Sequence, residues 1–400
     1  MKRKFSRRGV IKRAAVAAVL LALAALAVIA LARKEHTEPP QESAVPEPTA
    51  APEPDFETQA REILRQMSLH EKICQLLVME PEYLPDATGT VRSVTPVIEQ
   101  SLRDYPVGGI ILMPTNIHSA EQVKSLTAAL QDTASLPMIV CVDEEGGDVS
   151  RLAVKCGTTK LENMFAYRDD GPGVARANGR TLGRDLKQFG INTDLAPVAD
   201  VWSNPDNEVI GERAYSDDFG QAAELVAAAV RGFHDSGTIC CLKHFPGHGS
   251  TRTDTHKEAA FVDATLDELR EHELRSFQSG IDAGADMVMI GHLSVPDADD
   301  VIATYSRRIV TDLLRDEMGF DGVVITDGLE MQAAGTEPDS RKALRALQAG
   351  CDLLLGLHDV PETVEGLEQA VADGTLTEAE LDAHVLRVLV LKLCSGILVQ

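Results

Sequence analysis

The stretch ICCLKHFPGHGSTRTDTH, residues 239–256, joins a short apolar run to a polar, glycine-containing segment. The apolar run leads into Lys243 and His244, the chain then turns through a proline and two glycines, and the segment finishes with Asp254 and His256. A strand that carries titratable side chains into a glycine-rich loop holds reactive groups on a rigid support. We therefore interpret this stretch as a buried strand followed by an active-site loop.

Seven other apolar runs have the same character, and the alternation of all eight with helical patterns decides the fold. The eight expected strands span residues 73–79, 109–113, 138–145, 193–201, 239–245, 286–292, 322–327 and 352–357. Their starts are far enough apart for a crossover helix each time, and their continuous hydrophobicity is typical of strands buried on both faces. This pattern predicts an α/β protein with a single (β/α)8 TIM-type barrel over residues 57–400. An open doubly wound sheet is the alternative.

Helix starts support the alternation. Three pairs have the capping-box spacing, in which a serine or threonine is followed three residues later by Glu or Gln: Ser119 with Gln122, Thr265 with Glu268, and Thr377 with Glu380.

The charge and cysteine content of the chain restrict which molecules it is expected to bind. The 400-residue chain has a formal net charge of -24, although its first 34 residues carry nine Lys or Arg and no acid. An anionic body argues against nucleic acid as a partner. The seven cysteines are odd in number and form no CxxC pair, so we expect most of them to be buried small hydrophobes and expect no cofactor.

The N-terminus predicts export. Seven basic residues precede Ala14, and an uncharged apolar run follows over residues 14–32, so residues 1–34 are expected to be a signal peptide, cleaved after Ala32, or a membrane anchor. The segment SRRGVIK (6–12) resembles a twin-arginine signal, with an ordinary basic flank as the alternative. Residues 35–56, rich in proline and acids, are expected to be a disordered linker. The protein would then be extracytoplasmic, either secreted or touching the membrane only through this N-terminal segment.

Polar residues recur where the expected strands end. Such residues follow five of the strands: Asp143, Glu144, Asp200, Lys243, His244, His292 and Asp327. Reactive side chains of these barrels collect at the carboxyl ends of the strands, so this recurrence predicts one shared pocket. Asp327, followed by a glycine, is a candidate nucleophile, base or metal ligand.

Asp254 and His256 suggest proton transfer. A carboxylate beside an imidazole fixes the orientation of the ring and raises its proton affinity, which makes a general acid and base near neutral pH. The competing interpretation treats His244, His248, Asp254 and His256 as metal ligands for metal-assisted hydrolysis. The proline and glycine between the first two histidines disfavour the helix that an HxxxH zinc motif needs.

Four segments carry a resemblance to a known family. They are VDEEGGDVSRL (142–152), EVIGERAYSDD (208–218), KHFPGHGSTRTDTHKE (243–258) and GFDGVVITDGLEM (319–331). Together they resemble glycoside hydrolase family 3, and specifically its β-N-acetylhexosaminidase branch, over roughly residues 57–400.

The resemblance implies retaining hydrolysis of terminal β-linked N-acetylglucosamine, with peptidoglycan fragments (muropeptides) or related oligosaccharides as the expected substrates. Asp327 would be the nucleophile that forms a glycosyl-enzyme, and His256, assisted by Asp254, the general acid and base. Residues expected to bind the sugar are Asp143, Arg151, Arg213, Lys243 and His244, with His292 as a further pocket residue. No metal is implied.

Two positions depart from the family pattern. Asp148 stands where the family commonly has Arg, and Gly328 stands where it has Asp or Ala. The chain is also expected to lack the second domain that supplies an acidic Glu in β-glucosidase relatives. The alternatives are a β-N-acetylglucosaminide phosphorylase, a β-glucosidase-type activity and a non-catalytic glycan-binding protein.

Overall fold

The computed structural model describes residues 55–251 and 260–398. The expected leader and all but the last two residues of the expected linker lie outside the described residues, as do Asp254 and His256. In the described part of the chain, no helix combines the length and the apolar character that a membrane crossing requires.

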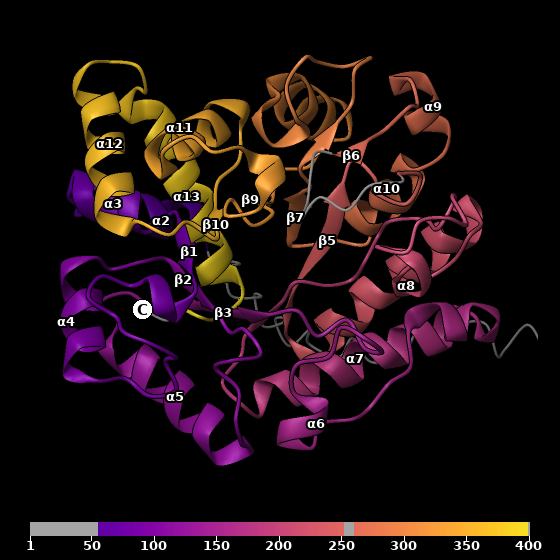
Figure 1. Ribbon diagram of the computed structural model, residues 1–400, viewed down its shortest axis with the longest axis horizontal. Helices are drawn as coiled ribbons and strands as arrows, with labels where there is room; N and C mark the ends of the chain where they lie inside the picture. Colours follow the sequence, from indigo (N-terminus) through magenta and orange to yellow (C-terminus); the bar gives the residue numbers. More distant parts are fainter. Residues whose placement is uncertain (1–54, 252–259, 399–400) are drawn as a thin grey trace, which may run out of the picture. The chain divides into compact units, whose positions relative to one another are not determined.

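Eight parallel strands form one sheet whose order follows the chain (Figure 1). They are β1 (Leu77–Met79), β2 (Gly109–Ile111), β3 (Ile139–Val142), β4 (Thr193–Asp194), β5 (Ile239–Phe245), β7 (Met287–Ile290), β9 (Val323–Thr326) and β10 (Leu354–Leu355). The last strand pairs with the first, and a parallel bridge between Ile325 and Leu353 joins β9 to the chain just before β10. The sheet is therefore a nearly closed barrel. This confirms the TIM-type prediction and excludes the open sheet.

Helices surround the strands (Figure 1). The longer ones are α2 (Phe56–Leu64), α4 (Pro96–Asp104), α5 (Ala120–Thr133), α7 (Pro172–Lys187), α8 (Phe219–Ser236), α10 (Leu274–Asp282), the π-helix η5 (Arg308–Glu317), α11 (Asp339–Ala349), α12 (Val360–Ala372) and α13 (Glu378–Cys394). Shorter ones are α3 (Leu69–Cys74), α6 (Ala153–Cys156) and α9 (Leu266–Glu271), and β6 (Ala260–Phe261) pairs with β8 (Leu293–Ser294) outside the barrel.

The predicted helix caps form, with one difference. The capping boxes headed by Thr265 and Thr377 are complete in both directions. Ser119 accepts a hydrogen bond from the backbone N–H of Gln122, but the side-chain oxygen of Gln122 accepts from His118 instead of returning to Ser119. The helix still begins where the sequence predicts.

The first strand begins later in the structure than the sequence predicted. Residues 73 and 74 belong to the last turn of α3, because Ser68 and Glu71 form a capping box that starts a helix at Leu69. The regular strand begins only at Leu77. Here the helix-start signal outweighs the apolar run that suggested a strand.

The fourth expected strand, residues 193–201, is regular only over β4. Pro197 has no N–H to donate to a ladder, which interrupts the regular pattern. The chain nevertheless stays beside β5, because the backbone N–H of Ala199 donates to the carbonyl of Lys243 at 2.7 Å. Asp200 is thereby held next to the end of β5.

Lys392 in α13 is completely buried. Its ammonium donates one hydrogen bond, to the side-chain oxygen of Gln75 at 2.8 Å. Burial lowers its pKa to about 7, because little water remains to stabilise the charge. The folded state therefore releases a proton that the unfolded chain keeps.

Replacing Lys392 should remove a pH dependence of stability. The pKa of an unfolded lysine is about 10.4, so between about pH 7 and 10 the unfolded chain binds more protons and the free energy of unfolding rises with pH, by at most about 1.4 kcal/mol per unit. Lys392→Met should lose this rise in urea denaturation at pH 7 and pH 9. Lys160→Met, at an exposed position, is the control. Equal pH slopes in wild type and Lys392→Met would contradict the assignment.

Candidate active site

A cavity of about 230 Å³ lies where the barrel strands end. Its charged and imidazole side chains are Glu80, Asp143, Glu145, Arg151, Arg213, Lys243, His244, His248, Asp327 and Glu330. Drug-sized ligands usually occupy roughly 300–1,000 Å³, so this volume suits a smaller ligand of about one sugar ring. Of the strand-end residues predicted to line a shared pocket, Asp143, Lys243, His244 and Asp327 come together here, and they are joined by Arg151 and Arg213, which the family resemblance implied as sugar-binding residues.

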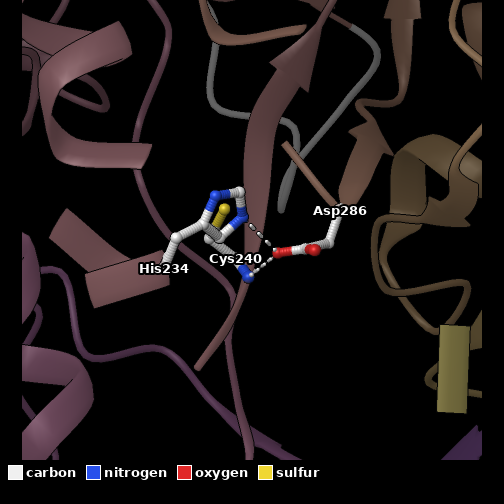
Figure 2. A group of neighbouring side chains, drawn as sticks. All are labelled: His234, Cys240 and Asp286. Atoms are coloured by element: carbon white, nitrogen blue, oxygen red, sulfur yellow. Dashed lines mark hydrogen bonds and ion pairs between the residues drawn. The ribbon is translucent and has the colours of Figure 1, made fainter. Parts of the chain in front are cut away.

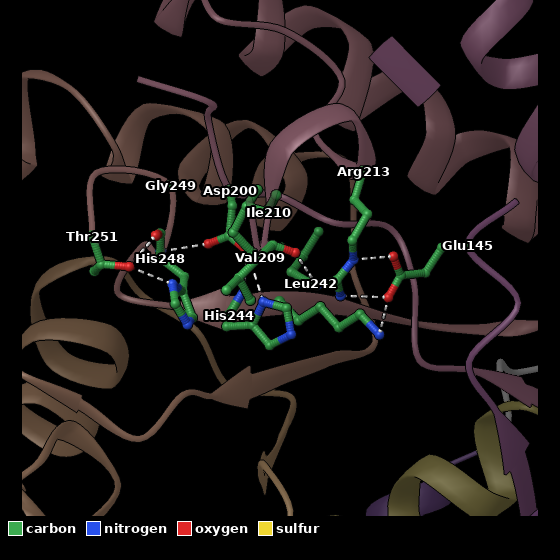
Figure 3. Close-up of polar contacts among 12 residues, drawn as sticks. Glu145, Asp200, Val209, Ile210, Arg213, Leu242, His244, His248, Gly249 and Thr251 are labelled. Atoms are coloured by element: carbon green, nitrogen blue, oxygen red, sulfur yellow. Dashed lines mark hydrogen bonds and ion pairs between the residues drawn. The ribbon is translucent and has the colours of Figure 1, made fainter. Parts of the chain in front are cut away.

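Lys243 is buried at the end of β5 and is neutralised by two carboxylates. Its Nζ lies 2.7 Å from Asp143 Oδ1 and 2.7 Å from Glu145 Oε1. Arg213 forms a two-pronged ion pair with the same Glu145, with both N–O distances 2.8 Å (Figure 3). Burial opposes the ionisation of Glu145, but the charges of Arg213 and Lys243 outweigh it and hold the pKa of that carboxyl well below its usual value.

Arg151 completes this wall of the cavity. Its Nη2 lies 3.8 Å from Asp143 Oδ2, so Asp143 is shared between Arg151 and Lys243. The Nε of Arg151 is buried and has no hydrogen-bond partner among the described residues. Donors of this kind, held in place but not fully used, are what sugar hydroxyls require.

Asp200 organises the neighbouring wall (Figure 3). It is completely buried, and it accepts hydrogen bonds from the ring Nδ1 of His244 at 2.7 Å and from the backbone N–H of His248 at 2.6 Å. Burial opposes its ionisation, but the charge and hydrogen bond of His244 hold the pKa of Asp200 below its usual value. With Nδ1 of His244 bonded to Asp200, its Nε2 is left for a ligand.

His248 was considered in the sequence only as a metal ligand, and the structure places it in the cavity wall. Its Nδ1 lies 2.7 Å from the hydroxyl of Thr251, whereas its Nε2 is buried without a partner among the described residues. Burial lowers the pKa of His248. Since Asp254 and His256 lie outside the described residues, the four-ligand metal set stays an untested hypothesis.

Asn207 joins the loop that carries Arg213 to the loop that carries His248. Its side-chain N–H donates to the carbonyl of His248 at 2.8 Å, and its side-chain oxygen accepts from the backbone N–H of Ile210 at 2.9 Å. This residue was not predicted from the sequence. Its position in a loop without a strand-end pattern gives no signal of such a contact.

Asp327 directly follows β9 and lines the cavity, as predicted. Its Oδ1 accepts a hydrogen bond from the backbone N–H of Gly328 at 2.8 Å. Burial raises the pKa of Asp327, but the charges of His244 and His292 and this hydrogen bond outweigh it, so the pKa lies below its usual value. The carboxylate is therefore ionised and able to attack an electrophilic carbon.

His292, predicted to be a pocket residue, lies one layer behind the cavity. It is completely buried, its Nε2 lies 2.8 Å from the carbonyl oxygen of Gly328, and its Nδ1 lies 2.7 Å from the hydroxyl of Thr304. Burial lowers its pKa. In this position it orients the backbone that follows Asp327.

The two departures from the family pattern lie in different places. Asp148 is exposed and hydrogen-bonds Asn163, and it is not among the residues that line the cavity. Gly328 does line it. Glu144, named in the sequence analysis as a strand-end residue, accepts hydrogen bonds from Ser150 and from two backbone N–H groups instead of facing the cavity.

Glu80 and Glu330 also line the cavity, although the sequence patterns did not predict them as site residues. Part of Glu330 is exposed, but burial of its carboxyl end, followed by the charges of Asp327 and Glu80, raises its pKa to about 7. Its carboxylate lies against the backbone of Gly328 and Gly356, where any added Cβ atom would collide with it. The site therefore holds a titrating carboxyl beside Asp327.

Comparisons with known proteins identify the family. The family model described as the glycosyl hydrolase family 3 N terminal domain matches residues 68–391 of the sequence. The chain belongs to this family. It is thus a glycoside hydrolase, which confirms the resemblance seen in the sequence.

Several proteins similar to this family 3 chain are named as hexosaminidases or acetylglucosaminidases. A Beta-hexosaminidase of Stenotrophomonas maltophilia (strain K279a) is 38% identical over 286 residues, which cover 70% of this chain and 84% of the relative. A solved family 3 beta-N-acetylglucosaminidase from Paenibacillus sp. str. FPU-7 has a TM-score of 0.77 and 33% identity, with 83% of this chain and 63% of that chain covered. A Beta-N-acetylhexosaminidase from Beutenbergia cavernae DSM 12333 has a TM-score of 0.70 and 30% identity, with 82% and 99% covered. The chain therefore spans less than two thirds of the Paenibacillus protein and nearly all of the Beutenbergia protein.

Removing the charge of Glu145 should destabilise this family 3 enzyme. Glu145→Gln leaves Arg213 and Lys243 buried with one carboxylate fewer, and breaking a buried ion pair costs about 3–5 kcal/mol. Urea denaturation should show that loss, and KM should rise because Arg213 is no longer held. Glu57→Gln, which breaks an exposed pair with Arg61, is the control and should cost less than about 1 kcal/mol. The assignment fails if the two substitutions cost the same.

Proposed function

We propose that the protein is a retaining β-N-acetylhexosaminidase that removes terminal β-linked N-acetylglucosamine. The observation that carries the proposal is the ionised Asp327 in a cavity of single-sugar size, facing a wall of fixed donors on Lys243, Arg213 and Arg151. The names of the relatives support the choice of sugar. A buried carboxylate with donors around it stabilises the positive charge that develops on a sugar ring and can also bond to it.

In the first step, a carboxylate oxygen of Asp327 attacks the anomeric carbon while the bond from that carbon to the glycosidic oxygen breaks. The leaving oxygen takes a proton from His256. Water then attacks the glycosyl-enzyme, gives its proton to His256, and releases Asp327. The sugar leaves with its original anomeric configuration because the carbon has been displaced twice.

The pair His256 and Asp254 is proposed on its match to the family motif, since both residues lie outside the described part of the chain. An imidazolium becomes neutral when it donates its proton, whereas a carboxylic acid would become a second anion near Asp327. A histidine therefore avoids charge repulsion in a cavity that already holds several carboxylates.

The proposed substrates are peptidoglycan fragments or related oligosaccharides met outside the cytoplasm. The basic and apolar residues 1–34 motivate the location, and the acidic, proline-rich stretch after them suits a spacer. Fractionation of cells that express the chain with and without residues 1–34 checks this. Recovery of both forms in the cytoplasm would contradict it.

The purified chain should hydrolyse aryl N-acetyl-β-glucosaminides. Asp327→Ala should lower kcat/KM by roughly a thousandfold or more on every leaving group, because the attacking atom is gone. His256→Ala should lose much less kcat/KM on a dinitrophenyl glycoside than on a phenyl glycoside, since dinitrophenolate leaves without a proton. Rates and products are measured by absorbance and mass spectrometry, with and without phosphate.

Asp321→Ala provides the matched control, because Asp321 is exposed in the same GFDG segment and should leave the rate unchanged. Full activity of Asp327→Ala would overturn the proposed nucleophile, and equal losses of His256→Ala on both leaving groups would overturn the proposed acid. Sugar 1-phosphate as the main product would replace hydrolysis by phosphorolysis. Release of glucose in preference to N-acetylglucosamine would replace the proposed sugar.

A further inference from the structure

Three side chains with metal-binding atoms meet at the end of the barrel opposite the cavity (Figure 2). His234 lies in the last turn of α8, Cys240 is the second residue of β5, and Asp286 directly precedes β7. Cys240 and Asp286 stand at the amino ends of two neighbouring strands, and His234 lies in the helix turn that leads into the first of them, whereas Asp327 and Lys243 lie at carboxyl ends. The cluster is therefore separate from the cavity.

The geometry places one ligand atom from each residue within 4.8 Å of the other two. The ring Nε2 of His234 lies 3.1 Å from Asp286 Oδ2, and the same oxygen accepts from the backbone N–H of Cys240 at 3.0 Å. Zinc binds sulfur at about 2.3 Å and nitrogen or oxygen at about 2.0–2.2 Å, so its ligand atoms lie roughly 3–4 Å apart in a tetrahedral site. The upper limit of 4.8 Å in this cluster is slightly wider than that spacing.

The set of donor atoms selects the kind of ion. One sulfur, one imidazole nitrogen and one carboxylate oxygen suit zinc and its neighbours in the first transition row, whereas calcium and magnesium prefer sites built entirely of oxygen. Cys240 is fully buried and Asp286 is partly exposed, while 36% of the His234 side chain is exposed. The His234 side of the cluster therefore faces solvent, whereas the thiol lies inside the protein.

We propose that His234, Cys240 and Asp286 form a binding site for a zinc-like divalent ion. The ion takes the place of the proton between His234 Nε2 and Asp286: a neutral ring then carries its proton on Nδ1, and an imidazolium releases its Nε2 proton to solvent. The thiol of Cys240 also gives its proton to solvent, so that the thiolate and the carboxylate together balance the two positive charges. Water occupies the remaining coordination position. The bound ion ties the end of α8 to the starts of β5 and β7 and stabilises that end of the barrel.

Cobalt is a suitable probe because a cobalt–thiolate bond produces a charge-transfer band in the near ultraviolet. The full-length chain, freed of metal with a chelator, is titrated with cobalt and then with competing zinc. We expect the band to appear at one equivalent and zinc to remove it. No cysteine is among the residues that line the catalytic cavity, so cobalt bound there by histidines does not produce this band.

Two variants test the ligands. Cys240→Ser should abolish the band, and His234→Ala, at an exposed position that leaves the core untouched, should weaken cobalt binding by at least about tenfold, since even loss of an outer partner costs about 10–100-fold. Cys156→Ser, a partly exposed cysteine of α6, is the matched control and should keep the band. Zinc should raise the Tm of wild type and Cys156→Ser only.

Absence of the band in folded wild type would overturn the proposal and leave a hydrogen-bonded His234–Asp286 pair. Unchanged affinity in His234→Ala, with folding verified by circular dichroism, would overturn it as well.

Discussion

The positive charge of Lys243, buried at the end of β5, has to be neutralised inside the protein. A charge taken out of water costs several kcal/mol unless an opposite charge meets it at close range. Asp143 and Glu145 come from the end of β3, and Arg213 comes from the loop after β4. These ion pairs therefore hold the end of β3, the loop after β4 and the end of β5 together. The floor and one wall of the cavity take their shape from this requirement.

Asp200 holds the end of β5 and the loop after it in the same way, through contacts to a buried charge. One buried carboxylate orients the ring of His244 and holds the backbone of His248, so the side of the site that faces Asp327 is set by charge as well as by packing. Because these groups already have their partners before a sugar arrives, little reorganisation is needed during the reaction. Such preorganisation is the main source of electrostatic catalysis in enzymes.

The sequence predicted the barrel well because strands buried on both faces consist of continuous apolar runs. The polar residues after several of these runs indicate the end of the barrel where the cavity lies. It did less well where two signals competed. The apolar run at residues 73–79 suggested a strand from its first residue, but the capping box of Ser68 and Glu71 turns the start into a helix. The sequence also did not show how deeply a strand-end residue is buried. His292 follows a strand, as the cavity residues do, yet it lies behind Gly328.

The individual residues of the site were harder to predict than its location in the barrel. The run Asp143-Glu144-Glu145 presents three acids, and only the fold reveals that the middle one turns away while the outer two meet Lys243. Glu330 stands three residues after Asp327, but the sequence does not say that its side chain turns into the cavity, and Glu80, directly after β1, is far from Asp327 in the chain. Contacts of this kind depend on register and side-chain direction, which a pattern of residue types does not contain.

The pairing of β1 with β10 has a consequence for how the protein is made. Synthesis begins at the amino terminus, so β1 emerges early and one of its edges has no hydrogen-bonding neighbour until nearly the whole barrel has followed. The contact between Gln75 and Lys392 likewise joins the beginning of the barrel to its last helix. A chain that has not yet emerged as far as residue 355 therefore keeps one edge of β1 unpaired, and an unpaired strand edge is a surface on which aggregation begins.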